Sequence, residues 1–88
     1  MKLISAKSNK DQKTVEYSIQ IGSDIMHSVA QMHTIQKKSE SKIMAVSLKP
    51  KITRHFDDDR ETLLQLVEIL KQVGQSGEPI ETPIDLKD

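Results

Sequence analysis

The sequence of 88 residues contains no cysteine. This absence excludes disulfides, thiolate zinc sites and cysteine nucleophiles, and it fits a reducing compartment. Aromatic residues are almost as rare, because the chain has one Tyr, one Phe and no Trp. The core must therefore be aliphatic, and few aromatic rings are present on which the bases of a nucleic acid could stack.

Glycine is also scarce, and its three positions (22, 74 and 77) do not form the glycine-rich loop that cradles a phosphate. None of the serines lies in the glycine-flanked nucleophile elbow of a hydrolase. A domain of this size has little room to enclose a pocket of ordinary ligand size. We therefore expect a protein that is not an enzyme and binds no cofactor.

The candidate metal ligands are three histidines and a run of acids, at His27, His33, His55 and residues 57–59. On a helix, His27 and His33 would lie about 120° apart and could not share an ion. The acid run lacks the alternating ligands, the glycine and the terminal Glu of a calcium loop. Carboxylates at this place are explained more simply as the cap of a following helix. No metal site is expected.

The chain has no net charge, but its two parts differ sharply. Residues 1–55 carry ten basic residues against four acids, whereas residues 56–88 carry three against nine. Such asymmetry is typical of a surface for nucleic acid or an acidic partner beside an acidic tail. The alternative is that the lysines protect sheet edges and the acids solvate a helix.

Residues 14–21 alternate apolar and polar side chains, which predicts a strand with one solvated face. Residues 2–7 predict a weaker strand, and the polar residues between the two segments indicate a β-hairpin. Residues 25–38 follow a capping Ser or Asp and carry apolar residues at helical spacing, so we expect a helix. The alternative is a strand, because Ile25, Val29 and Ile35 would also share one face of it.

Residues 41–48 carry apolar side chains on both faces, which favours a central strand, and residues 51–56 are expected to add a short edge strand after Pro50. The clearest helix is predicted for residues 58–73, with Asp58 as its cap and Gly74 just past its end. The predicted fold is a small α+β domain in the order β-β-α-β-(β)-α. Its sheet is mainly antiparallel and two helices pack on one face.

We assign residues 1–74 to this domain and residues 75–88 to an acidic tail that is either flexible or partner-binding. In the tail, Ile80, Thr82, Ile84 and Leu86 recur with a period of two, so the segment could add to an exposed sheet edge of its own domain or of a neighbour. Pro79 and Pro83 would restrict it to an edge position.

A single domain of this length buries only about 60–65% of the surface of its unfolded chain. Oligomerisation is a common remedy for so small a core, so a homodimer is expected. The first residues are too short an apolar run for a signal peptide, and no stretch approaches the length of a membrane span. We expect a cytoplasmic protein without a membrane partner.

These observations favour a non-enzymatic module that binds a protein partner as a regulator or inhibitor, a profile shared by small proteins that phages and other mobile elements encode. The alternative is a nucleic-acid-binding protein that uses the basic region from Lys37 to Arg54. The candidate partner-binding residues are Lys37, Lys38, Lys42, Lys49, Lys51 and Arg54 in the basic region and Ile80, Ile84 and Leu86 in the tail.

Overall fold

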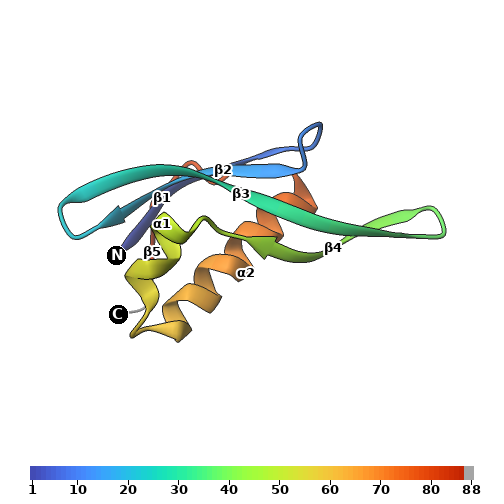
Figure 1. The fold of residues 1–88 in the computed structure, drawn as a ribbon. Helices are drawn as coiled ribbons and strands as arrows, with labels where there is room; N and C mark the ends of the chain where they lie inside the picture. The colour runs from blue at the N-terminus through green and yellow to red at the C-terminus, as the bar shows by residue number, and fades with distance from the viewer. Residues whose placement is uncertain (87–88) are drawn as a thin grey trace.

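The computed structural model describes residues 1–86. It contains an antiparallel sheet of five strands in the order β4-β3-β2-β1-β5, and one long helix lies across one face of the sheet (Figure 1). The predicted mixture of helix and sheet in one small domain is confirmed. In chain order the elements are β1 (Lys2–Asn9), β2 (Thr14–Ile21), β3 (Asp24–Lys37), β4 (Glu40–Ser47), the short helix α1 (Pro50–Thr53), the 3-10 helix η1 (Arg54–Phe56), α2 (Arg60–Ser76) and β5 (Ile84–Asp85).

The core lies between the sheet and α2. The alternating residues Val15, Tyr17 and Ile19 of β2 are at most 2% exposed, as the sequence pattern predicts. They belong to the same buried cluster as Leu66 and Leu70 of α2. Full burial of an aliphatic side chain contributes roughly 1.5–3 kcal/mol, so this layer is the main source of stability. The predicted hairpin of β1 and β2 is confirmed by their antiparallel pairing.

The segment expected to form a helix from residue 25 to residue 38 is the strand β3, so that prediction is wrong. Met26 and Ala30 face the core, and residues four apart share a face in a helix and in a strand alike. The turn before β3 and the pairing of β3 with β2 and β4 favour the strand. Gly22 adopts a left-handed φ of 64° in the two-residue connection between β2 and β3, which closes a hairpin rather than starting a helix.

The expected central strand, β4, lies at the edge of the sheet, because the preceding strand β3 occupies the position beside β2. The edge strand expected over residues 51–56 is instead the pair of short helices α1 and η1. Pro50 begins α1, where its missing N–H leaves no hydrogen bond unmade and its fixed φ suits a helix. The sheet face therefore carries one long helix and one short one, not two long helices.

The long helix α2 begins and ends later than predicted. Asp59, not Asp58, is its cap and accepts hydrogen bonds from the Thr62 backbone N–H at 3.1 Å and the Thr62 hydroxyl at 2.6 Å. Gly77 ends the helix with a φ of 76°, whereas Gly74 lies inside it. Gly74 serves close packing, since a Cβ there would lie 2.9 Å from Ile43 Cδ1 and closer still to Met32 Sδ.

After α2 the chain returns along the outer edge of β1. Ala6 and Ile80 exchange backbone hydrogen bonds of 3.0 and 2.8 Å, and β5 pairs with Lys2 and Leu3. The Leu86 side chain is 3% exposed and belongs to the core. Of the two possibilities raised by the sequence, the structure shows strand addition within the same domain for the residues up to 86.

Candidate functional site

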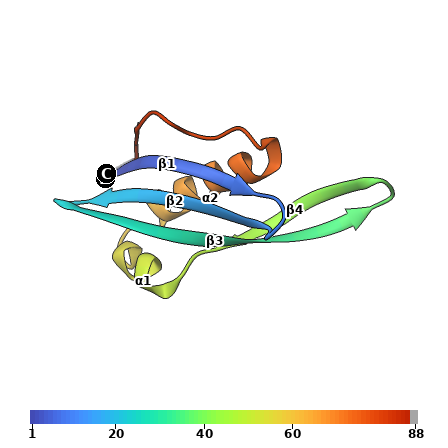
Figure 2. The same cartoon turned by 90° about the horizontal axis from the view of Figure 1, so that it is seen from above.

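Strands β3 and β4 continue past the rest of the sheet as a two-stranded arm, which we define as residues 33–45. The last residue of β3 that pairs with β2 is Gln31, opposite Thr14, whereas β3 pairs with β4 as far as Lys37 opposite Glu40. The five β3 residues of the arm span about 17 Å at strand spacing. Figures 1 and 2 show the arm projecting beyond α2 and beyond the β1–β2 hairpin.

The turn between β1 and β2 lies against the root of this arm. The backbone carbonyl of Lys13 accepts hydrogen bonds from the Met32 N–H at 2.9 Å and from Gln31 Nε2 at 3.1 Å. Lys10 and Lys13 also line a hollow of about 220 Å³ together with the arm residues Thr34, Ser41 and Ile43. Two hairpins that are distant in the sequence therefore meet at one end of the molecule.

This meeting collects exposed lysines, which we call the basic end. Within the two hairpins five lysines stand against two acids, Asp11 and Glu40, and α2 adds Glu68 and Lys71, which line a hollow with residues 40–43. Three of the lysines were predicted as binding residues, whereas the two from the β1–β2 turn were not, because nothing in the local pattern links that turn to the arm. The basic end consists of Lys10, Lys13, Lys37, Lys38 and Lys42.

The other predicted basic residues lie elsewhere. Lys49, Lys51 and Arg54 follow β4, whose eight residues separate the arm tip from α1 by about 25 Å. All three are exposed, and the acid run 57–59 follows directly on the same segment. Together with Arg60 and Glu61, that segment has four bases and four acids, so it carries no excess charge. The structure thus divides the basic region into two separate groups.

The tail residues that were predicted to bind a partner instead contact their own domain. Ile80 is bonded to β1, Ile84 is half-buried in β5, and Leu86 lies in the core. A partner strand could pair with this segment only after displacing it from β1. The tail therefore offers a partner less free backbone than its sequence suggests.

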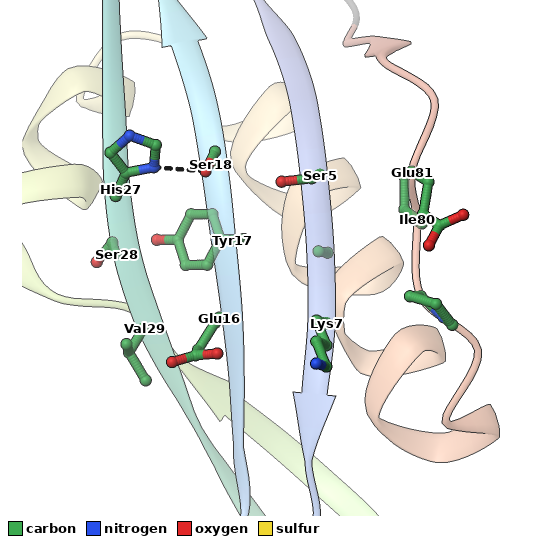
Figure 3. A pocket seen from close by; sticks show the side chains of 12 residues that line it. Ser5, Lys7, Glu16, Tyr17, Ser18, His27, Ser28, Val29, Ile80 and Glu81 are labelled. Atoms are coloured by element: carbon green, nitrogen blue, oxygen red, sulfur yellow. Dashed lines mark hydrogen bonds between the residues drawn. The ribbon is translucent and has the colours of Figure 1, made fainter.

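The sheet face opposite α2 is open and carries a shallow hollow of about 540 Å³ (Figure 3). Ser18 and His27 form a cross-strand hydrogen bond of 2.6 Å between the serine hydroxyl and Nδ1 at the floor of this hollow. A catalytic serine needs a histidine that is oriented by a third group. Among residues 1–86, His27 has no second hydrogen-bond partner, so the pair does not make up a triad.

The same face bears opposite charges rather than an excess of one sign, since Lys7 stands directly across from Glu16. His33 repeats the hydroxyl–imidazole pairing further along, with its Nε2 2.7 Å from the Ser47 hydroxyl. Within the described part of the chain, no group of three His, Asp or Glu residues is placed to hold a metal ion. These pairs therefore act as links between neighbouring strands.

The two aromatic side chains of the protein are in the core. Tyr17 is 2% exposed and Phe56 is 1% exposed. Burial raises the pKa of the Tyr17 hydroxyl, and the nearby Ser28 side chain offsets part of that rise. The Tyr17 hydroxyl nevertheless has no partner in good hydrogen-bonding geometry among the described residues. No Tyr, Phe or Trp ring among the described residues is available at the surface for stacking.

Comparison of the chain with protein-family models, with curated proteins and with solved structures found no match. Among residues 1–86, no helix has the length and apolar character needed to cross a membrane.

Proposed function

We propose that the protein is a non-enzymatic module that binds nucleic acid through the basic end. The observation that carries the proposal is that Lys10 and Lys13 lie at the root of the arm whose tip and flank carry Lys37, Lys38 and Lys42. One of the features behind the protein-partner hypothesis was the tail, which lies along its own β1 edge up to residue 86. Capture of a protein partner becomes the competing outcome, and homodimer formation stays a prediction.

The backbone at the two turns supports a binding role for their lysines. Lys13 and Lys38 adopt left-handed φ values of 55° and 56°, a conformation that costs an ordinary residue about 1–2 kcal/mol. At Gly22 and Gly77, where the chain also needs positive φ, it has glycine. Glycine would relieve the strain at the two lysines as well, but it would remove a positive charge from the basic end.

The strength of the expected binding follows from counterion release. A protein that neutralises five phosphates has a slope of log K against log salt of about −4.5. Between 50 and 200 mM salt its affinity falls about 500-fold. Sequence-independent binding of this kind is weak at physiological salt, with Kd values of about 10⁻⁴ to 10⁻⁶ M, so the measurement must start at low salt.

The test compares two triple variants, each of which removes three positive charges from a different part of the molecule. Replacement of Lys37, Lys38 and Lys42 by Ala leaves two of the five lysines, so the slope should fall to about −1.8 and the salt effect to about 12-fold. The control variant, with Lys49, Lys51 and Arg54 replaced by Ala, loses three charges at the other end of the molecule and should keep the wild-type slope. Fluorescence anisotropy of a labelled duplex measures both.

Equal slopes for the two triple variants would contradict the assignment of the basic end. Failure of the wild-type protein to bind any DNA or RNA at 50 mM salt would overturn the proposed function itself. In that case, recovery of one protein partner whose binding is insensitive to salt would favour the protein-binding alternative.

A further inference from the structure

We infer that the nucleic acid is duplex DNA and that the arm enters its major groove. This inference rests on the proposed function and names its substrate class. It is drawn from two features of the described residues, the lack of an exposed Tyr, Phe or Trp ring and the shape of the arm.

The side chains argue against a single-stranded ligand. Proteins that bind single strands stack the unpaired bases on exposed aromatic rings. Tyr17 and Phe56 are at most 2% exposed. The exposed imidazoles of His27 and His33 are each hydrogen-bonded to a serine hydroxyl, and the open sheet face balances Lys7 with Glu16 instead of forming a basic groove. A ligand whose bases are already stacked, and which presents its phosphates outward, matches this surface better.

The arm has the dimensions of a groove reader. The major groove of B-form DNA is about 12 Å wide and 8.5 Å deep and admits a two-stranded β-ribbon. Neighbouring strands lie about 4.8 Å apart, so the two strands with their side chains fit that width. Beyond Thr34 and Ile43, which pack at its root, the three remaining β3 residues of the arm extend for about 10 Å, slightly more than the groove depth. From residue 35 to residue 42 every side chain is exposed.

The arm carries side chains that can contact the backbone phosphates of a duplex and others that can contact its base edges. Lys37 and Lys38 at the tip, and Lys42 on the flank, can contact phosphates on either side of the groove. Gln36 and Ser41 stand opposite each other, so their amide and hydroxyl groups can reach base edges together. Ile35 is 38% exposed and pairs with Lys42, which offers an apolar contact to thymine methyl groups.

The experiment uses the full-length protein and four fluorescent probes of one length and sequence at 50 mM salt. They are a DNA duplex, the same duplex with glucosylated 5-hydroxymethylcytosine, the single strand, and the corresponding RNA duplex. The glucose groups fill the major groove without changing the phosphate charge. The RNA duplex has a deep, narrow major groove that side chains cannot read. We expect at least tenfold weaker binding to each of the last three probes than to unmodified DNA.

A variant with Gln36 and Ser41 both replaced by Ala should lose most of the preference for the unmodified duplex over the glucosylated one. A variant with Ser23 replaced by Ala, in the β2–β3 turn, is the control and should keep that preference. Equal binding of glucosylated and unmodified duplex would overturn the groove inference while leaving the proposed function intact. Tighter binding of the single strand would overturn it as well. Absence of binding to all four probes would instead refute the proposed function.

Discussion

Replacement of Gly74 by Ala tests whether α2 is held close to the root of the arm. In an exposed helix interior this change is favourable by about 1 kcal/mol, because alanine is the better helix former. Gly74 is buried, however, and a Cβ there would lie 2.9 Å from Ile43 Cδ1 and closer still to Met32 Sδ. The variant therefore sets helix propensity against overpacking.

The packing term should be the larger of the two. Met32 and Ile43 are each 5% exposed, so neither side chain can move into solvent without leaving the core. Forcing an extra methyl group into a packed core costs about 1–3 kcal/mol. After the gain in helix propensity is subtracted, the free energy of unfolding should fall by about 1 kcal/mol.

Urea denaturation of four proteins measures this balance, namely wild type, Gly74→Ala, Met32→Ala and the double variant. Truncation of Met32 alone removes core volume and should cost about 2–5 kcal/mol. In the Gly74→Ala background it also makes room for the new methyl group, so it should cost about 1–2 kcal/mol less. Gly22→Ala is the control. It is strained by its φ of 64° but has no neighbour within 4 Å, and it should show no coupling to Met32.

The reasoning is refuted if Gly74→Ala raises the free energy of unfolding by about 1 kcal/mol and shows no coupling to Met32→Ala. That result would mean that only helix propensity acts at this position. A coupling of similar size for the Gly22→Ala control would show that the cycle reports a general loss of stability rather than the contact.

Two further changes test the tail and the buried hydroxyl. Leu86→Ala should lower the free energy of unfolding by at least about 2 kcal/mol, because Leu86 is 3% exposed in the core. Thr82→Ala, at the surface, should change it by less than about 0.5 kcal/mol. Equal values for the two variants in urea denaturation would mean that the tail does not pack. Tyr17→Phe removes a buried hydroxyl without a well-placed partner, so stability at pH 7 should stay the same or rise by about 1 kcal/mol. Burial raises the pKa of Tyr17 in the folded state, so the wild-type protein should lose stability as the pH rises past about 10, because the unfolded chain ionises first. The Phe variant lacks this group and should not show that loss. Urea midpoints that are similar for the two proteins at pH 8 and fall in parallel by pH 10.5 would contradict the assignment.

Local sequence patterns predict an element correctly when the spacing of its apolar side chains fits either a strand or a helix but not both. The strict alternation of residues 14–21 fits a strand and nothing else, and β2 is found there. The apolar residues of α2 recur every three or four positions, and most of that helix is where the pattern places it. In β3 the spacing of four fits both periods, so the pattern alone cannot decide. The choice depends on pairing with β2 and β4, which is a long-range property.

The same limit applies to the candidate site. Lysines 37, 38 and 42 are recognisable in the sequence as a cluster, but their grouping with Lys10 and Lys13 depends on strand order. Conversely, Lys49, Lys51 and Arg54 are close to that cluster in sequence and far from it in space, because the extended strand β4 separates them. Charge counted along the chain therefore assigns Lys49, Lys51 and Arg54 to the basic end, where they do not belong, and leaves out Lys10 and Lys13, which do.

The arm gives the basic end its shape, and the arm depends on a residue that carries no charge. An isolated two-stranded hairpin is at best marginally stable in water, so the arm needs an anchor. Met32 and Ile43 supply it by packing at its root against Gly74 of α2. Binding should be tighter when Lys37 and Lys38 are already held in place, because less conformational freedom is then lost. Gly74→Ala should therefore weaken DNA binding without altering the slope of log K against log salt. A change in that slope would mean that the substitution removes phosphate contacts rather than loosening the arm that presents them.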